Sequence, residues 1–532
     1  MINLPRLKTG DRLVTLTGER VDLFGFQTLF PNVARGDDRD KLLWQVIAEA
    51  RDEQASPSAL LKDAELKREL SARLDLGPEA SPVVSEALVG RFFNRKKGVR
   101  VLLPTHASLP LNYKHTSKTG TPSRYRLYNG GLVPFLLWNG HGVARTPLIR
   151  LLDVVENEGE FTALDRKFLD IARDGSAFPD LKASAESLIV RYEEDLRADF
   201  DRFGGPFCQP SLDRFARDLE TVLDTDLPRP DKIHWLTLLL SLHVGIRLYR
   251  IAVVKGFELD RAVAAAACMD PPAEAVVDDH CCSGDGSGRL EKCALAGRIR
   301  FRTGTGRYRP IRQRDGARTS WMDVDHRRLL DMPATLVTRT LASAAWEALG
   351  GGERAARMDV DALARALKAD SDLRVSHGAA CAAIAVIHHS QWRQGATFEE
   401  LLDVSRTSER RPGLHALRNE VRHMRRGDLR HQGRDIVNQL LLDVNVGSPG
   451  SLLSRNGSLT FFEVDEEMLL LLVRLTCRDA QVPFTEFVEG LRAYGLEPQD
   501  DSELAALADA LERLGLLARY SDSGEASFVH FN

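Results

Sequence analysis

The sequence predicts a mainly α-helical, multidomain protein, built of helical bundles with small β-ribbon insertions and a C-terminal winged-helix domain. Its 532 residues are too many for one ordinary hydrophobic core. Apolar residues recur at helical spacing through most of the chain, behind start signals such as Ser81–Pro82. The final segment contains three helix patterns followed by two strand patterns, which is the element order of a winged helix.

Changes in composition divide the chain into segments. Helical patterns alternate with stretches rich in Gly, Pro, Asn or Arg, where loops and short strands are expected. The expected segments are an N-terminal helical domain (1–86), a basic loop- and strand-rich segment (87–152), a helical domain (153–282), a Gly- and Arg-rich β-ribbon insertion (283–330), a further helical domain (331–457) and an acidic winged helix (458–532).

The most apolar helix is expected at residues 233–254. Its apolar run is interrupted by His243, Arg247 and Arg250, and is too short for the roughly 30 Å of a bilayer core, so we expect a buried helix. The N-terminus lacks the apolar segment of a signal peptide. The seven cysteines show no disulfide-framework spacing. We therefore expect a cytoplasmic protein that does not contact a membrane.

The C-terminal elements follow one another in a clear order. Residues 465–477 are Leu-rich and predict a first helix, and residues 482–495 predict a short strand that leads into a second helix. Residues 500–517 predict a third helix, whose acidic start suits a helix N-terminus. Residues 518–531 predict two strands around a Ser- and Gly-containing turn.

The charge of this C-terminal domain argues against a role in DNA binding. Residues 460–532 contain five Arg and fifteen Asp and Glu, a net charge of −10. A surface of this sign repels the phosphates whose neutralisation supplies much of the affinity for DNA. We therefore interpret the winged helix as a protein-docking domain. The carboxylates expected to meet a basic partner are Asp500, Asp501 and Glu503, and the expected apolar anchors are Tyr520, Phe528, Phe531, Phe461 and Phe462.

Positive charge gathers elsewhere, in two segments nearly free of acid. Residues 87–152 contain eleven Lys and Arg and no Asp or Glu, and residues 297–318 contain eight Arg and one Asp. In the second segment Arg alternates with Ile299 and Phe301, which places the guanidinium groups on one face of a strand. Guanidinium groups pair well with phosphate oxygens, so double-stranded DNA is the expected partner. The expected DNA contacts are Arg91, Arg95, Lys96, Lys97, Arg100, Lys114, Lys118, Arg124, Arg126, Arg298, Arg300, Arg302, Arg307, Arg309, Arg312 and Arg314.

An alternative is that these basic clusters form salt bridges within the protein, since the rest of the chain is acidic. A third and weaker cluster, residues 417–434, is diluted by Glu420 and Asp428. No GxxxxGK[ST] phosphate loop is present, so an ATP-driven role would need a partner to supply the motor. Cysteines and a histidine between Cys268 and Cys293 lack the paired spacing of structural zinc, so no metal or other cofactor is expected.

One motif leaves a nuclease open as an alternative function. Arg418–His423 matches the RxxxxH pattern of HEPN ribonucleases, with Asn419 following the arginine. The same spacing recurs at Arg229–His234, Arg410–His415 and Arg426–His431, as expected in an Arg-rich chain. A nuclease acting on DNA, or a HEPN-type RNase, is therefore one alternative, and a purely structural interaction protein is another.

Near the C-terminus, Leu469–Leu472, Gly495, Ser521–Glu525 and Val529 form a recognisable pattern. With it, the final segment resembles the tail of the G component (DptG, DndG) of DNA phosphorothioation-dependent restriction systems. The resemblance implies a non-motor subunit of a bacterial anti-phage complex, with an F-type ATPase and a HerA/FtsK-like translocase as partners. It implies no catalytic residues. The expected function is thus a DNA-binding and scaffolding subunit that works with a partner ATPase.

Overall fold

The computed structural model of this protein is mainly α-helical, which confirms that part of the fold class expected from the sequence. In the described part of the chain, the strands form a two-stranded hairpin and a three-stranded antiparallel sheet. The residues that the structure describes are 42–43, 46–47, 68, 71–72, 78–92, 132–138, 143–163, 165–166, 208–272, 326–356, 359–392, 413–422, 452–456, 459–462, 464–496, 498, 501–520 and 527–531.

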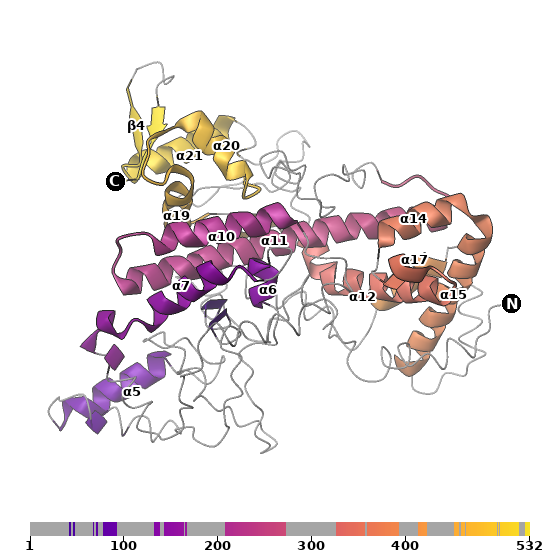
Figure 1. Cartoon of the computed structure of the whole chain (residues 1–532), viewed down its shortest axis with the longest axis horizontal. Helices are drawn as coiled ribbons and strands as arrows, with labels where there is room; N and C mark the ends of the chain where they lie inside the picture. Colours follow the sequence, from indigo (N-terminus) through magenta and orange to yellow (C-terminus); the bar gives the residue numbers. More distant parts are fainter. Residues whose placement is uncertain are drawn as a thin grey trace.

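One long helix, α11 (Arg229–Ala266), runs through the middle of the molecule (Figure 1). Its 38 residues span about 57 Å. It begins with Pro230 in the first turn, where a missing N–H breaks no hydrogen bond. Residues 238–254 are buried on every side, because other helices surround them. Of the helices in the described part, α11 is the one long and apolar enough to cross a membrane, and 94% of its most apolar stretch is buried inside the protein.

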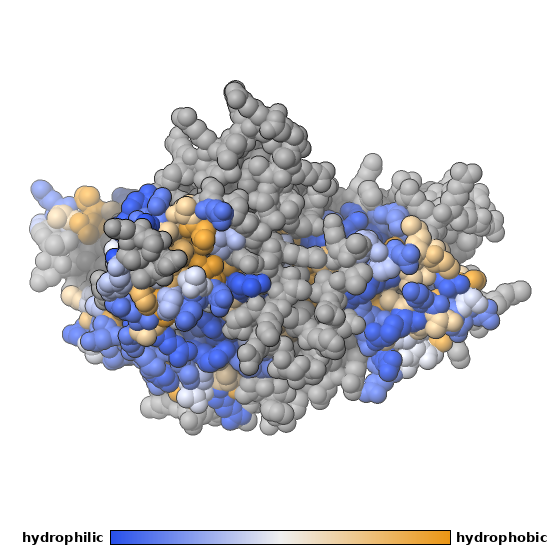
Figure 2. All heavy atoms as spheres, turned by 90° about the horizontal axis from the view of Figure 1, so that it is seen from above, coloured by the Kyte–Doolittle hydropathy of each residue, from blue (hydrophilic) through white to orange (hydrophobic). Residues whose placement is uncertain are grey.

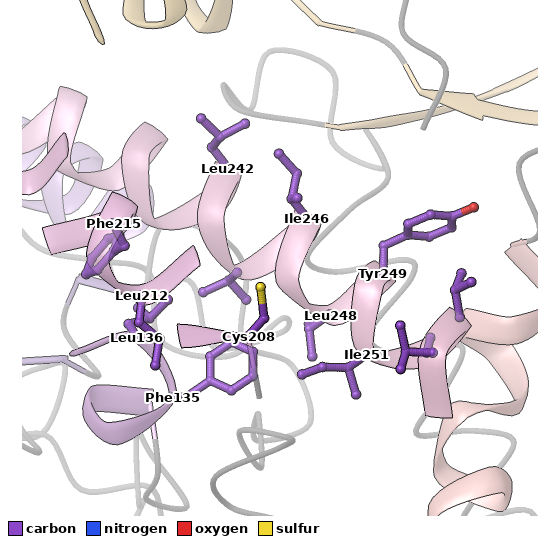
Figure 3. Close-up of a cluster of buried hydrophobic side chains, with 14 of the residues drawn as sticks. Phe135, Leu136, Cys208, Leu212, Phe215, Leu242, Ile246, Leu248, Tyr249 and Ile251 are labelled. Atoms are coloured by element: carbon purple, nitrogen blue, oxygen red, sulfur yellow. The ribbon is translucent and has the colours of Figure 1, made fainter. Parts of the chain in front are cut away.

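The first half of α11 packs against α10 (Gln209–Leu223), which also contacts α6 (Leu132–Leu137) and α7 (Arg145–Glu156). The apolar face of α10, which includes Leu212 and Phe215, is buried at helical spacing. Figure 3 shows these side chains beside those of α6 and α11. The residues labelled there are Phe135, Leu136, Cys208, Leu212, Phe215, Leu242, Ile246, Leu248, Tyr249 and Ile251. The chain also forms α5 (Ala80–Phe92) and the short 3-10 helix η4 (Glu158–Glu160).

The second half of α11 contacts α12 (His326–Ala348), α14 (Val360–Ala369) and α17 (Gly413–Arg422). Two further helices, α13 (Gly352–Ala356) and α15 (Ser371–Trp392), pack against these three. Helices α15 and α17 cross closely at Gly413, where an added Cβ would lie 1.8 Å from the carbonyl oxygen of Gly378. A side chain at Gly413 would therefore push the two helices apart.

Ion pairs join this second group of helices to α11. Arg418 of α17 lies 2.6 Å from Asp260 of α11, and Arg339 of α12 pairs with the buried carboxylate of Glu258. The side chain of Lys255 lies 2.7 Å from the same Glu258. These pairs satisfy the charges that α11 carries into the protein interior, where an unpaired charge is costly.

The C-terminal part contains the β structure. A hairpin of β1 (Leu453–Asn456) and β2 (Leu459–Phe462) comes first. The elements that follow are α19 (Glu466–Cys477), β3 (Val482–Pro483), α20 (Phe484–Arg492), α21 (Asp501–Arg513), β4 (Leu517–Arg519) and β5 (Ser527–Val529). We call the elements from α19 to β5, with Tyr494 and the residues after β5, the C-terminal module. Its sheet has the order β3-β5-β4, with both pairs antiparallel.

Several of the expected segment boundaries fall within helices or between paired strands. The boundaries at residues 86, 152 and 330 fall inside α5, α7 and α12, each of which is a continuous helix. The boundary at residue 457 separates β1 from its partner β2, although the two strands pair with each other. The segment expected to be rich in loops and strands, 87–152, also contains the helix α6 and most of α7. The apolar residues of these helices have helical spacing, but the Gly and Pro residues between the helices favour a prediction of loops for the whole segment.

Candidate functional site

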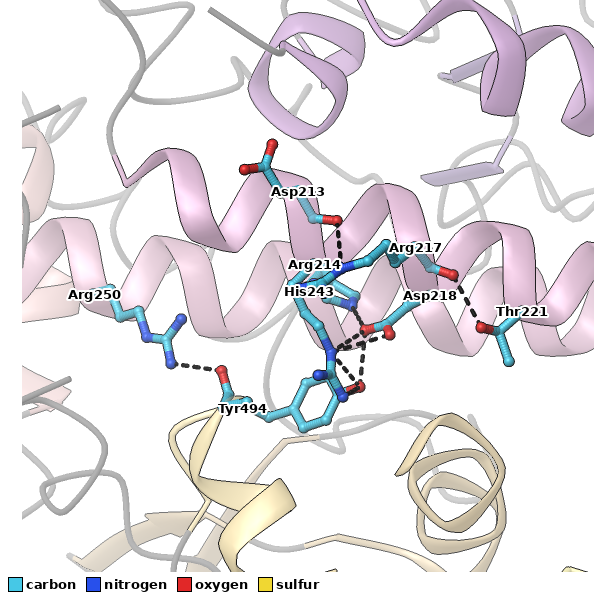
Figure 4. A network of polar contacts seen from close by, with 9 residues as sticks. Asp213, Arg214, Arg217, Asp218, Thr221, His243, Arg250 and Tyr494 are labelled. Atoms are coloured by element: carbon cyan, nitrogen blue, oxygen red, sulfur yellow. Dashed lines mark hydrogen bonds and ion pairs between the residues drawn. The ribbon is translucent and has the colours of Figure 1, made fainter. Parts of the chain in front are cut away.

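A group of polar side chains meets where the C-terminal module lies against α10 and α11 (Figure 4). The hydroxyl of Tyr494 donates to Asp218 Oδ2 over 2.8 Å, and His243 Nε2 lies 3.0 Å from the same oxygen. Arg214 Nε is 3.1 Å from Asp218 Oδ1, and its Nη2 donates to the Tyr494 hydroxyl over 2.8 Å. We call these four residues, Arg214, Asp218, His243 and Tyr494, the joint.

Local structure explains how each residue reaches the joint. Arg214 and Asp218 are four residues apart on α10, so their side chains lie on the same face of that helix. His243 comes from the buried middle of α11. Tyr494 lies in the turn that ends α20, where Gly495 adopts a φ of 72° and the amide of Leu496 donates to the carbonyl of Leu491.

Burial controls the electrostatics of the joint. Asp218 is 1% exposed and Tyr494 2% exposed. Burial lowers the pKa of His243 against the opposing effect of Asp218, so the imidazole is neutral and its Nε2–H donates to the carboxylate. Burial and the Asp218 charge raise the pKa of Tyr494 well above its usual value, so its hydroxyl keeps its proton. The joint therefore holds one cation and one anion, linked through two neutral donors.

Contacts beside the joint extend the interface along α11. Arg250 donates to the carbonyl oxygen of Ala493 over 3.0 Å. Near the N-terminal end of α11, the rings of Trp235 and Phe531 lie edge to face with centroids 5.6 Å apart, and His234 lies 3.1 Å from Glu467. The interface thus covers roughly 24 Å of the helix. So long an interface holds the module in one orientation on the core.

Sequence reasoning misses the joint, although signals for it exist. In the sequence His243, Arg247 and Arg250 are only interruptions of an apolar helix. In the structure Arg247 donates to Ser211 and lies over the ring of Phe135, with 5.0 Å from its Cζ to the ring centroid. Burial lowers the pKa of Arg247 to about 10, which leaves it charged at neutral pH. Polar residues inside an otherwise apolar helix thus indicate a buried polar interface.

The module turns a different surface away from the core. In Figure 1, α19 lies next to α10, whereas α21 and β4 lie farther out. Asp501, Asp509 and Glu512 are exposed on α21, and Glu503 is half-buried. Glu512 lies 2.5 Å from Arg519, while Asp501 and Asp509 have no ion-pair partner among the described residues. Asp500 lies outside the described part of the chain. The structure thus brings two of the three expected docking carboxylates, Asp501 and Glu503, to the start of α21.

The expected apolar anchors divide into different environments. Tyr520 is 63% exposed, and its ring lies edge to face with that of the half-buried Phe528, with centroids 5.6 Å apart. Phe531 packs instead against Trp235 and Arg474. The ring of Phe531 is thus engaged within the protein, and its role as a partner anchor stays a prediction. The side chains of Phe461 and Phe462 lie outside the described part.

The surface at this end of the molecule is mostly polar. Figure 2 views the protein from above the C-terminal module and shows mainly hydrophilic side chains among the described residues, with apolar ones in small groups. A partner that binds to this face would therefore contact mainly charged side chains and only small apolar groups. Such surfaces select partners through electrostatic complementarity.

The side chains of the expected DNA contacts all lie outside the described part of the chain. The backbone of Arg91 belongs to α5, and its side chain lies outside the described part. The other contacts expected in residues 95–126 and 298–314 also lie outside the described part of the chain. Within the basic segment, Arg150 of α7 pairs with Asp224. Salt bridging within the protein thus accounts for one cation of that segment.

The RxxxxH motif and a buried cysteine beside a histidine have structural roles where they are described. Arg418 of the RxxxxH motif pairs with Asp260, and Asn419 Nδ2 lies 2.9 Å from His415 Nδ1, while His423 lies outside the described part. Cys381 lies 3.7 Å from His377 Nδ1, but burial raises the pKa of this thiol far above its usual range. It therefore stays protonated and unreactive. No group of three or more His, Cys, Asp or Glu in the described part could hold a metal ion.

Residues that carry the resemblance to the restriction-system component also have structural roles. Leu469, Leu472 and Val529 are fully buried, and Gly495 is in a left-handed turn. Ser521–Glu525 lies outside the described part. No family model matches this chain, and no curated protein matches it. Any functional conclusion therefore depends on the chemistry of the chain's own residues.

Proposed function

We propose that this protein is a cytoplasmic, non-motor subunit that binds double-stranded DNA and bridges partner proteins in a bacterial anti-phage restriction complex. The observation that carries the proposal is the exposed acidic face of α21, on a module whose opposite side is held against the core through the joint. A module fixed in this way presents one surface in a constant direction, as a scaffold requires.

We further propose that the C-terminal module is a winged helix. The order α19, β3, α20, α21, β4, β5 and the sheet order β3-β5-β4 support this assignment. Its third helix, α21, then takes the place that reads the major groove in DNA-binding relatives of this fold. Because Asp501 and Asp509 are exposed there, this helix suits Lys and Arg on another protein and repels phosphate.

An apolar contact must accompany the charges, since exposed charges mainly speed the encounter and select the partner. Tyr520 is the best candidate, because it is exposed on the β4 side of the module and supported from one side by Phe528. Aromatic residues of this kind often supply much of the binding energy of an interface. The proposed docking surface therefore consists of Asp501, Asp509 and Tyr520.

The proposed DNA contacts lie in the basic segments 87–152 and 297–318, whose composition supports the assignment. The sequence contains no ATP-binding loop, so the motor would come from a partner, for which we propose the F-type ATPase or the HerA/FtsK-like translocase. The resemblance of the C-terminal residues to the G component of phosphorothioation-dependent systems supports this choice of partners.

Charge reversal at Asp509 tests the docking surface. Asp509→Lys should slow association with the co-expressed translocase about tenfold while leaving DNA affinity unchanged or slightly increased. Asp153→Lys is the matched control, because it makes the same charge change at an exposed site of α7 on the core. Equal loss in both variants, or no loss in Asp509→Lys, would show that the partner binds elsewhere.

A further inference from the structure

The centre of the contact between the module and the core depends on hydrogen bonds to one carboxylate. Asp218 Oδ2 accepts from Tyr494 and from His243, and Arg214 pairs with the same group. A buried ion pair adds little net stability, but changing the charge of one member is strongly destabilising. The strength of this contact therefore depends on the protonation of the residues in the joint.

We propose that the joint is a proton-operated latch, in which protonation of His243 releases the C-terminal module from α10 and α11. Histidine is the side chain whose charge changes near neutral pH in water. Its ring lies edge to face with that of Tyr494, with centroids 5.8 Å apart, so His243 touches the module directly. Protonation of His243 therefore acts directly on the contact between the module and the core.

The described groups that surround His243 oppose a second positive charge. From α10 it faces Arg214 and Asp218, from its own helix Arg250, and from the module Tyr494. The one carboxylate among them already balances Arg214. A proton on His243 would thus add charge beside two guanidinium groups in a site that excludes water. Separation of the module lets water solvate the imidazolium and the carboxylate.

The direction of the pH effect follows from burial. In the closed joint burial lowers the pKa of His243 below its usual value, with Arg214 and Arg250 acting in the same direction. After release the pKa returns towards about 6.5. The released state therefore binds more protons at pH values below this, and docking weakens by up to about tenfold for each further pH unit. From about one pH unit above this value both states are neutral at His243 and docking has its full strength.

This inference concerns contacts within the chain, so it holds whether or not the protein binds DNA or an ATPase. Release would also separate Trp235 from Phe531 and His234 from Glu467. The direction in which the module presents α21 would then no longer be fixed by the core. Acidification is thus expected to change a geometry that neutral conditions hold constant.

Energy transfer between two dyes tests the latch in the full-length chain. Noncanonical amino acids at Arg217 of α10 and Ala505 of α21, both exposed, would carry the dyes. Transfer efficiency should fall between about pH 7 and about pH 5.5 while far-ultraviolet circular dichroism stays constant. In His243→Gln the response should disappear, because the glutamine amide still donates to Asp218 but binds no proton. His234→Gln is the matched control and should keep the response, since it removes a half-buried histidine of the same interface.

Two results would overturn the proposal: a distance that does not change with pH in the unmodified chain, or the same pH response in His243→Gln. A second measurement covers the case in which His243→Gln does not fold. Exchange of the histidine C2 hydrogen, read by mass spectrometry, reports the pKa of His243 in the unmodified protein. A pKa at or above about 6.5 would also exclude the latch.

Discussion

His243 and Tyr494 donate to the same carboxylate oxygen, Asp218 Oδ2, over 3.0 Å and 2.8 Å. One residue lies in the middle of α11 and the other in the turn after α20, so this carboxylate links the core to the C-terminal module at the centre of their interface. Arg214 balances the charge of this carboxylate and also donates to the tyrosine hydroxyl. The stability of the module's position therefore depends on a few polar atoms that can be changed one at a time.

Removing the Tyr494 hydroxyl should weaken the joint. Tyr494→Phe keeps the buried ring but deprives Asp218 of a donor and Arg214 of an acceptor. The free energy of unfolding should fall by about 1–2 kcal/mol, measured by urea denaturation at neutral pH. Tyr520→Phe, at an exposed position, should change it by less than about 0.5 kcal/mol. Equal effects in the two variants would mean that the hydrogen bonds of the Tyr494 hydroxyl do not stabilise the joint.

Glu258 should make the protein sensitive to strong acid. Burial opposes its ionisation, but Arg339 and Lys255 lower the pKa of this carboxyl to about 2. A lowered pKa stabilises the fold above the unfolded value of about 4.5, and this contribution is lost as pH falls towards about 2, amounting to about 3 kcal/mol. Glu258→Gln should lower stability at neutral pH and flatten the acid part of the profile, measured by denaturation at several pH values. Glu489→Gln, an exposed control, should leave the profile unchanged.

DNA binding should depend steeply on salt and little on sequence. Removing one cation that neutralises a phosphate should reduce the slope of log affinity against log salt by about 0.9. Replacing Arg298, Arg300, Arg302, Arg307 and Arg309 with Ala should therefore flatten the slope by several such steps in a fluorescence titration. Replacing the exposed Arg217, Arg365 and Arg478 should leave it nearly unchanged. An unaltered slope in the first variant would place the DNA-binding surface elsewhere.

The purified chain should not cleave DNA or RNA by itself. Arg418 of the RxxxxH motif is paired with Asp260 and joins α17 to α11. Arg418→Ala should therefore reduce stability by about 1–3 kcal/mol without removing a catalytic group, because Asp260 keeps its contact with Arg328 at 3.0 Å. The measurement is an incubation with labelled nucleic acids in the presence of divalent cations. Cleavage by the native chain that disappears in His423→Ala would support the HEPN alternative instead.

The sequence by itself determined the local elements whose signals lie within a few turns of chain. Acidic residues at the start of residues 500–517 and their apolar spacing predicted α21, and the turn within 518–531 predicted the pairing of β4 with β5. The apolar run at 233–254 predicted a buried helix at α11. Helical spacing and turn residues act between neighbours, so one sequence is enough to recognise them.

Tertiary structure alone decided which distant residues meet. Asp218 and Tyr494 are 276 positions apart, and no local sequence pattern around either residue predicts that they form a hydrogen bond. The same holds for Phe531, whose ring packs against that of Trp235, far away in the sequence. The pKa of His243 is lowered because packing removes water from its ring, and no local pattern encodes that. Helices whose apolar faces can pack in several ways acquire specific partners only when all of them are buried together.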